Sequence, residues 1–218
     1  MFALKVADVR AELKCLLLNK QYVVSRGSTT VEIVGASFLA DEGAVLGAVC
    51  DTYAQRELAW YMSQSLNIAD FPTPVPKIWE ACAGKDGSVN SNYGWCMFSK
   101  ENGHQYENVK TALLRDPGTR RAEAVYTRPS MHDDAIKNGR QDFMCTNAVV
   151  YLLRDEKLHC IVQMRSSDAV LGYKNDRLWH LFVLSQLASE LCVGTGSVYW
   201  QAGSLHVYER HFKLLESA

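Results

Sequence analysis

The alternation of apolar and polar residues divides the first half of the chain into helices and strands. Residues 4–19 place apolar side chains at positions 6, 9, 13, 16 and 17, a spacing that predicts an amphipathic helix. Residues 31–35 alternate and then reach a glycine, which predicts a strand with a kink or bulge. Residues 55–66 predict a second helix, and residues 71–76 hold three of the five prolines, which predicts a connector.

The second half of the chain is richer in strand patterns. Residues 122–127 alternate, and two β-rich runs at 148–153 and 158–164 flank an Asp-Glu turn, which predicts a hairpin. A helical pattern follows at residues 177–192, and residues 197–204 predict a further strand. A length of 218 residues fits one domain, over residues 1–218, with a sizeable core.

Composition narrows the class of protein. An apolar content of 48% with 22% charged residues is ordinary for a soluble globular protein. The formal net charge of −1 and the lack of a long basic run argue against binding a nucleic-acid polymer. No apolar run has membrane-spanning length, and the N-terminus lacks the layout of a signal peptide. The seven cysteines are scattered and lack the spacing of a zinc site, so we expect no metal site. Their odd number and scatter indicate a reduced cytosolic setting. Most of them have apolar neighbours in sequence, and we expect these to be small core residues.

The most informative stretch begins at Arg165 and reads Arg-Ser-Ser-Asp-Ala-Val-Leu-Gly-Tyr-Lys-Asn-Asp. Arg165 and Ser166 offer a bidentate cation and a hydroxyl, a good pair for phosphate or carboxylate. Asp168 and Asp176 put two carboxyl groups on the same rim, and Gly172 lets the backbone come close to a ligand. Taken alone, the stretch also fits a surface loop with ordinary charges.

The same stretch, Arg-Ser-x-Asp-x-x-x-Gly with a polar residue eight positions after the aspartate, resembles the nucleotide-binding signature of the thymidylate synthase family. The polar residue in that signature is Asn, which matches uracil, whereas this sequence has Asp176 and is similar to the cytosine-specific branch, the deoxycytidylate hydroxymethylases of DNA phages. The resemblance runs from about residue 23 to 212 and includes Ile-Trp, Asn-Ser-Asn-Tyr-Gly-Trp and Phe-Met-Cys-Thr-Asn. It implies an α/β (α+β) thymidylate synthase-like fold, with a mixed β-sheet, flanking helices and sheet packing at a dimer interface.

The resemblance also implies which residues carry the chemistry. Cys145 matches the family's nucleophile, and several arginines nearby would favour its thiolate. Glu57, in Glu-Leu-Ala-Trp, matches the proton-relay glutamate, and burial among apolar neighbours would raise its pKa as a general acid or base requires. Asp176 would accept a hydrogen bond from the cytosine amino group.

The remaining residues are implied to bind the two substrates. The expected nucleotide-binding residues are Arg26, Tyr93, Arg120, Arg121, Arg165, Ser166, Asp168, Asp176, His206 and Tyr208, and the expected folate-binding residues are Trp79, Asp168 and Gly172. Arg120 and Arg121 would cross to the phosphate of the other subunit, so a homodimer with shared sites is implied. His206 and Tyr208 share one face of an extended segment and resemble the clamp on the sugar 3′-hydroxyl. Without the resemblance, the same residues read as a basic loop and a structural histidine.

The implied activity is transfer of a one-carbon unit from 5,10-methylenetetrahydrofolate to carbon 5 of dCMP, with water addition giving 5-hydroxymethyl-dCMP for modified DNA. The setting would be the cytoplasm of a phage-infected bacterium. One alternative is a folate-dependent dCMP or CMP 5-methyltransferase, and a second is a non-catalytic nucleotide-binding protein. The sequence stops at Ala218, before the C-terminal lid of thymidylate synthases, so we expect water to reach the site more easily.

Overall fold

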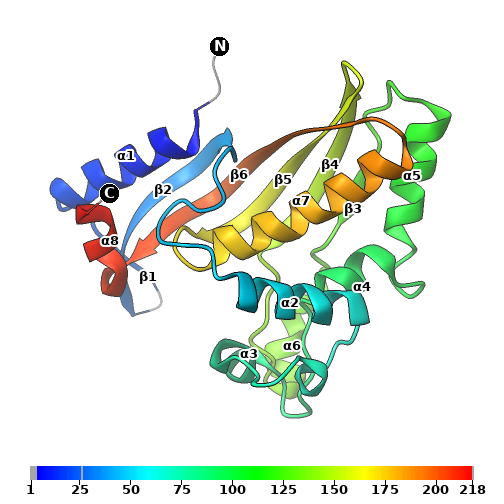
Figure 1. The fold of residues 1–218 in the computed structure, drawn as a ribbon. Coiled ribbons are helices and arrows are strands. Elements are labelled where there is room, and N and C mark those ends of the chain that lie inside the picture. Colours follow the sequence, from blue (N-terminus) through cyan, green and yellow to red (C-terminus); the bar gives the residue numbers. More distant parts are fainter. Residues whose placement is uncertain (1–3, 26, 218) are drawn as a thin grey trace. The chain divides into compact units, whose positions relative to one another are not determined.

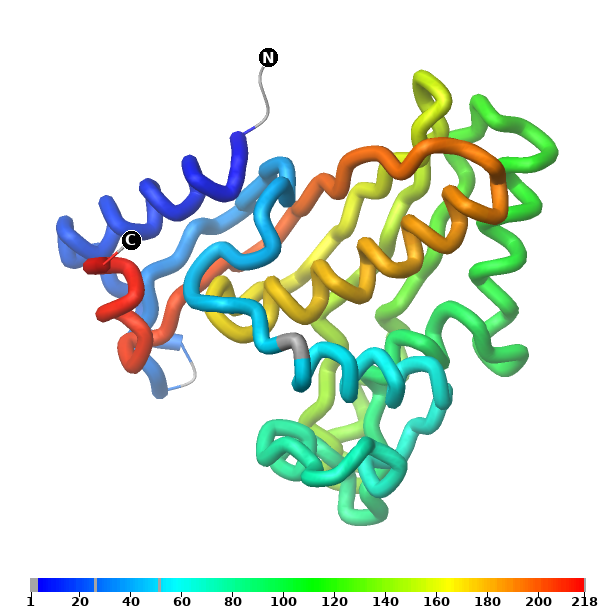
Figure 2. The backbone as a smooth tube through the Cα atoms, viewed as in Figure 1, coloured from blue at the N-terminus to red at the C-terminus, as the bar shows by residue number. Residues whose placement is uncertain are grey.

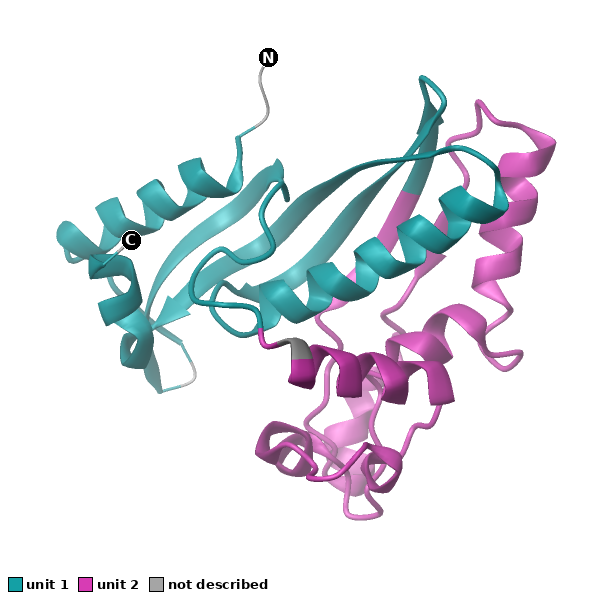
Figure 3. Cartoon of the chain, in the orientation of Figure 1, with its two compact units in different colours: residues 1–49, 151–218 teal, residues 50–150 magenta. Residues whose placement is uncertain are grey.

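The protein was analysed as a computed structural model that describes residues 4–25 and 27–217, and of Asp51 the backbone alone. The chain divides into two compact units (Figure 3), of which unit 1 comprises Met1–Val49 and Tyr151–Ala218 and unit 2 comprises Cys50–Val150. The strand order in the mixed sheet is β1-β2-β6-β5-β4-β3. The mixed sheet with helices matches the predicted fold class, and a single domain over residues 1–218 stays a prediction.

The elements of unit 1 are α1 (Val6–Leu18), β1 (Val23–Ser25), β2 (Ser28–Leu39), β5 (Lys157–Asp168), α7 (Gly172–Glu190), β6 (Gly194–Tyr208), η2 (Glu209–His211) and α8 (Phe212–Glu216). The elements of unit 2 are α2 (Asp51–Ser63), η1 (Ile68–Asp70), α3 (Lys77–Cys82), α4 (Tyr93–Phe98), α5 (Gln105–Arg115), β3 (Glu123–Val125) and α6 (Met131–Asn138). Strand β4 (Thr146–Arg154) contributes residues to both units.

The core of unit 1 lies between the sheet and α7 (Figures 1 and 2). Strands β5 and β6 run parallel with α7 as the crossover between them, while β2 pairs with β6 antiparallel. The fully buried indole of Trp200 on β6 packs edge-on against two rings of α7, with centroid distances of 5.1 Å to Tyr173 and 5.9 Å to His180. Burial of these large rings fixes the helix on the strands that end at the candidate site.

Strand β2 bends at the glycine that the sequence singled out. Gly35 has φ +71°, a conformation that glycine adopts without the steric cost of a side chain. The pairing continues unchanged from Val34 opposite Ser204 to Ala36 opposite Ala202. Of the two possibilities raised by the sequence, the kink is therefore confirmed, since no residue is inserted as in a bulge.

Several other predicted elements are confirmed. Helix α1 buries Val6, Val9, Leu13 and Leu17 on one face, and α8 packs beside it. The hairpin of β4 and β5 turns through Asp155 and Glu156, whose φ values of 49° and 57° are those of a type I′ turn. Residues 71–76 form the expected connector between η1 and α3.

The prediction that most cysteines are core residues is wrong. Only Cys96 and Cys160 are buried; Cys15, Cys50 and Cys192 are exposed, and Cys82 and Cys145 are half-buried. Apolar neighbours in sequence are a poor guide on a helix, because adjacent residues point in different directions. Cys15, for example, precedes three leucines but lies on the outer face of α1.

Unit 2 is held together by an aromatic core. Trp60 of α2 packs against Phe71 at 5.3 Å and against Trp79 at 5.0 Å between ring centroids. Helices α2 and α4 approach so closely that a Cβ on Gly94 would lie 1.7 Å from the carbonyl oxygen of Tyr61. This contact places the first turn of α4 directly against the helix that bears Glu57.

Candidate functional site

The candidate residues belong to both units, so the two groups are described separately. The residues expected to read the base and to bind the sugar lie in unit 1, on β5, β6 and the start of α7. The proposed nucleophile and the buried glutamate lie in unit 2, before β4 and on α2.

Helix α7 begins earlier than the sequence predicted, and this changes the setting of Asp176. The predicted helix started near residue 177, but α7 starts at Gly172. The carboxylate of Asp168 accepts hydrogen bonds from the main-chain N–H of Val170 at 2.8 Å and of Leu171 at 3.2 Å, which stabilises the entry into the helix. Gly172 and Asp176 therefore lie one turn apart on a helix, whereas the sequence suggested a loop.

Asp168 and Asp176 both lie close to Gly172. A Cβ on Gly172 would lie 3.5 Å from Cβ of Asp168 and 3.7 Å from Oδ2 of Asp176. Asp176 reaches this point because residues four apart stack on one helix face. A larger side chain at position 172 would fill the space beside both carboxyl groups.

A polar row continues across the ends of β5 and β6. Ser166 pairs with Ser204, and Asp168 pairs with His206, in parallel register. His206 and Tyr208 pack edge-on with their ring centroids 5.0 Å apart, so they lie on one face of β6 as the sequence predicted. Burial lowers the pKa of His206, although the carboxylates of Asp168 and Glu32 act in the opposite direction.

The arginines expected at the phosphate remain predictions. Arg165 is exposed near the end of β5, and Arg120 and Arg121 are exposed just before β3. Arg26 lies outside the described residues. Arg128, which follows β3, stacks on Trp95 at 4.7 Å and donates a hydrogen bond to Oδ1 of Asn90 at 3.1 Å.

Glu57 is buried on α2 with 6% of its surface exposed, which confirms the setting predicted from its apolar neighbours. Burial raises the pKa of Glu57 to about 7, and the hydrogen bond from Tyr53, together with the nearby Trp79 indole, counteracts only part of that rise. The Tyr53 hydroxyl donates to Oε1 at 2.7 Å from one turn earlier on the same helix. A carboxyl group in this state can take up or release a proton near neutral pH.

Cys145 is half-buried and immediately precedes β4. Its loop is fixed by Asp142, whose carboxylate accepts from the main-chain N–H groups of Asn90 at 2.6 Å and Ser91 at 2.7 Å, and from the Ser91 hydroxyl at 2.5 Å. Asn90 in turn donates to the main-chain oxygen of Asp142 at 2.9 Å. Burial raises the pKa of Asp142, and these hydrogen bonds act against that rise. The segment before α4 therefore holds the loop that carries Cys145.

Three other thiols have surroundings that do not suit a nucleophile. Burial raises the pKa of Cys82, of Cys96 and of Cys160 to about 12 in each case. A thiol with such a pKa is almost entirely protonated at neutral pH, and the thiolate is the reactive form. Asp142 and Cys145 lie near enough to Cys82 to raise the pKa of its thiol further.

Trp79 and Tyr93 both take part in the aromatic core of unit 2. Trp79 is half-buried on α3 and packs edge-on against Trp60. The ring of Tyr93 is buried, stacked on Tyr61 at 5.1 Å and edge-on to Tyr126 at 5.4 Å. A role for Trp79 at the folate and for Tyr93 beside the nucleophile remains a prediction.

Comparisons with known proteins agree with the resemblance. The family model described as thymidylate synthase matches residues 48–218. The chain is 46% identical over 222 residues to the deoxycytidylate 5-hydroxymethyltransferases of Enterobacteria phages T4 and T2, covering 98% of this chain and 90% of each relative. It is 25% identical over 168 residues to a thymidylate synthase of Francisella tularensis subsp. holarctica, covering 72% of this chain and 61% of that relative.

The chain belongs to the thymidylate synthase family. Residues 48–218, which the family model matches, include the signature around Arg165, the Asp at position 176 and the Cys before β4. Asp176 departs from the Asn of the signature that the sequence resembles, and its role as the base reader remains a prediction.

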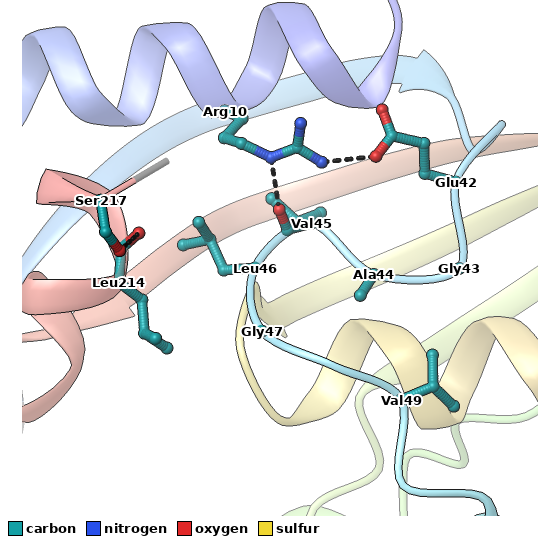
Figure 4. Close-up of a pocket in the computed structure, with 10 residues that line it drawn as sticks. All are labelled: Arg10, Glu42, Gly43, Ala44, Val45, Leu46, Gly47, Val49, Leu214 and Ser217. Carbon is teal, nitrogen blue, oxygen red and sulfur yellow. Dashed lines mark hydrogen bonds and ion pairs between the residues drawn. The ribbon is translucent and has the colours of Figure 1, made fainter.

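A cavity of about 580 Å³ lies elsewhere in unit 1 (Figure 4). Its lining comes from α1, the loop after β2 and α8, and comprises Arg10, Glu42, Gly43, Ala44, Val45, Leu46, Gly47, Val49, Leu214 and Ser217. Among the residues that the structure describes, none of those predicted for the thymidylate synthase-type site lines it. Arg10 crosses the cavity wall to donate to Glu42 at 2.6 Å and to the carbonyl oxygen of Val45 at 2.8 Å, so its guanidinium is already engaged.

Within residues 4–25 and 27–217, no helix is long and apolar enough to cross a membrane. The same described residues contain no group of three or more His, Cys, Asp or Glu side chains that could hold a metal ion.

Sequence reasoning did not single out Asp142, Tyr53, Glu32 or Ser204. Tyr53 lies four residues before Glu57, so helical spacing alone could have indicated the pair. Asp142 bonds residues about 50 positions earlier, and no local pattern reveals such a contact.

Proposed function

We propose that this chain is a deoxycytidylate 5-hydroxymethyltransferase, with dCMP and 5,10-methylenetetrahydrofolate as substrates. The observation that carries the proposal is the 46% identity, over 98% of the chain, to phage proteins of that name. The Asp at position 176, where uracil-specific members of the family have Asn, supports cytosine as the base. The product would serve as a precursor of modified DNA in the cytoplasm of an infected bacterium.

The first step is assigned to Cys145. Its thiolate adds to carbon 6 of the cytosine ring, which turns carbon 5 into an enamine-like nucleophile. Carbon 5 then attacks the one-carbon unit of the folate. Loss of the carbon 5 proton and breakage of the bond between that carbon unit and the folate nitrogen release tetrahydrofolate and leave an exocyclic methylene group. The half-buried position of Cys145, in contrast to the deeply buried Cys96 and Cys160, suits a thiol that must meet a substrate.

The second step is assigned to Glu57. Water adds to the exocyclic methylene group, and elimination of the Cys145 thiolate gives 5-hydroxymethyl-dCMP. A carboxyl group with a pKa of about 7 is suited to orient that water and to accept its proton. Delivery of hydride from the folate instead of water would give 5-methyl-dCMP.

The remaining residues hold the substrates. The Asp176 carboxylate accepts a hydrogen bond from the cytosine amino group, and His206 with Tyr208 holds the sugar 3′-hydroxyl. Arg165 and Ser166 bind the phosphate, joined by Arg26 and, from a second subunit, by Arg120 and Arg121. Trp79, Asp168 and Gly172 face the folate.

The test is release of tritium from dCMP labelled at carbon 5, with the folate present. We expect release by the wild type and none by Cys145→Ser, which should still bind dCMP because the substitution removes only the nucleophilic sulfur. Cys192→Ser is the matched control, since it makes the same change at an exposed site. Binding of dCMP without tritium release would identify a non-catalytic nucleotide-binding protein and would refute the proposal.

A further inference from the structure

A short chain of polar side chains joins β2 to the sugar-binding end of β6. The Ser204 hydroxyl donates a hydrogen bond to Oε1 of Glu32, and Ser204 Oγ lies 3.2 Å from Nδ1 of His206. Glu32 and His206 are direct partners across the β2–β6 pairing. The Ser204 hydroxyl therefore links the Glu32 carboxylate on β2 to the His206 imidazole on β6.

The directions of these hydrogen bonds follow from the chemistry of the groups. A carboxylate can only accept, so the single hydrogen of the Ser204 hydroxyl is used toward Glu32. The Ser204 oxygen can then only accept from His206, which places the imidazole proton on Nδ1. A neutral imidazole has one N–H, so Nε2 is left as a hydrogen-bond acceptor.

Burial favours this neutral form, whereas the neighbouring carboxylates favour the protonated imidazole. His206 is 9% exposed, and burial lowers its pKa. Two carboxylates lie beside it, Glu32 on β2 and Asp168 on β5, and both pair with His206 in register. Arg210 is the cation that opposes them, and its guanidinium stacks on Tyr208 at 4.3 Å.

We propose that Glu32, acting through Ser204, positions His206 as a hydrogen-bond acceptor and so selects nucleotides that carry an unmodified 3′-hydroxyl. The selection rests on the function proposed for His206. A 3′-hydroxyl can donate its hydrogen to Nε2, whereas a 3′-deoxy sugar has no hydrogen to donate. A 3′-phosphate would meet an acceptor nitrogen and the charges of Glu32 and Asp168, which repel an anion. Glu32 and Ser204 are thus positioning residues that determine specificity.

The binding experiment compares dCMP with 2′,3′-dideoxy-CMP by calorimetry. One hydrogen bond to a neutral acceptor corresponds to about tenfold in affinity, so the wild type should prefer dCMP by about that factor. Glu32→Ala and Ser204→Ala should each reduce this preference to less than about threefold, with affinity for the dideoxy nucleotide unchanged. The double variant should lose no more than either single variant, because both substitutions break the same chain. Glu12→Ala, on the exposed face of α1, should keep the wild-type preference.

Nitrogen-15 NMR of the histidines gives a second readout that does not depend on turnover. The wild-type His206 should carry its proton on Nδ1, and Ser204→Ala should shift part of the population to the Nε2–H form. An Nε2–H tautomer in the wild type, or an unchanged dCMP preference in both variants, would overturn the proposal. Failure of the proposed function is recognised separately, because the wild type would then release no tritium from labelled dCMP. Even in that case, the position of the His206 proton measured by NMR tests whether Glu32 positions this side chain.

Discussion

At the residue scale, two carboxyl groups in different surroundings divide the proposed chemistry. Glu57 is enclosed in unit 2, where burial raises its pKa to about 7. Asp176 is half-buried on α7, one turn after Gly172, and its carboxylate would lie in van der Waals contact with a Cβ at that glycine. The first group is suited to proton transfer, and the second is suited to hold a base by hydrogen bonding.

Replacing Asp176 by Asn should move selectivity from dCMP toward dUMP. The Asn side chain offers a donor and an acceptor in the arrangement that uracil requires, and a good bidentate contact contributes about 1–3 kcal/mol to discrimination. We expect the ratio of kcat/KM for dCMP to that for dUMP to fall by about ten- to a hundredfold. Asp155→Asn is the matched control, because it makes the same change at an exposed turn position that Asn tolerates. An unchanged ratio in Asp176→Asn would remove Asp176 as the base reader.

Replacing Glu57 by Gln should remove one component of the pH dependence of stability. A carboxyl group whose folded pKa is raised stabilises the fold fully below its unfolded pKa, and this stabilisation is lost as pH rises through the folded pKa. Because burial raises the pKa of Glu57 from its ordinary value of 4.5 to about 7, the wild type should lose about 3 kcal/mol relative to the variant between pH 4.5 and 8. Urea unfolding at several pH values measures this difference, and Glu12→Gln, an exposed substitution, should show none. Parallel pH curves for the wild type and Glu57→Gln would mean that Glu57 is not desolvated.

At the element scale, the loop of residues 139–145 depends on a single buried carboxylate. Asp142 accepts three hydrogen bonds from residues 90 and 91, and Gln141 donates its main-chain N–H to the carbonyl oxygen of Cys82 at 2.9 Å. These contacts fix the middle of the segment that leads to Cys145.

Asp142→Ala should destabilise unit 2 and slow the reaction. Three donors would lose their acceptor in a buried site, which should lower the free energy of unfolding by about 3 kcal/mol. We also expect kcat to fall at least about tenfold, because a small misplacement of the nucleophile is costly. Asp142→Asn is the matched control, since its amide oxygen can still accept from the two main-chain N–H groups. Full kcat in the alanine variant, measured well below its melting temperature, would show that the loop keeps its shape without the carboxylate.

Much of the fold followed from periodicity, because α1, the β4–β5 hairpin and the kinked strand β2 are each defined by neighbours in sequence. The start of α7 did not follow, since it depends on the Asp168 carboxylate capping two N–H groups in a stretch that carries no apolar period. The burial of Glu57 was predictable from its apolar neighbours, whereas the contacts of Asp142 and Glu32 join segments far apart in the chain. The exposed cysteines show the same limit, because burial depends on which face of an element a residue occupies.

At the scale of the whole molecule, the proposal requires two subunits. Arg120 and Arg121 are exposed just before β3, as is expected of side chains that bind the phosphate in the site of a second subunit. A homodimer with shared phosphate sites would let a chain of net charge −1 bind a dianion.

Shared sites predict complementation between two inactive variants. The double variant Arg120→Ala/Arg121→Ala keeps the nucleophile, and Cys145→Ser keeps the arginines. Refolding an equal mixture should place half of the molecules in heterodimers with one complete site each, so activity should return to about a quarter of the wild-type value. Refolding each variant alone is the control and should give almost no activity. Absence of recovery, with mixed dimers detected by native mass spectrometry, would show that each subunit builds its own phosphate site.

The most direct measurement is the identity of the product. The protein is incubated with 5,10-methylenetetrahydrofolate and, in parallel, with dCMP, CMP or dUMP, and both the nucleotide and the folate are analysed by mass spectrometry. We predict that dCMP is the preferred substrate, that it gains one CH2O group, and that the folate is recovered as tetrahydrofolate. A gain of CH2 with formation of dihydrofolate, or a preference for dUMP, would contradict the proposed function.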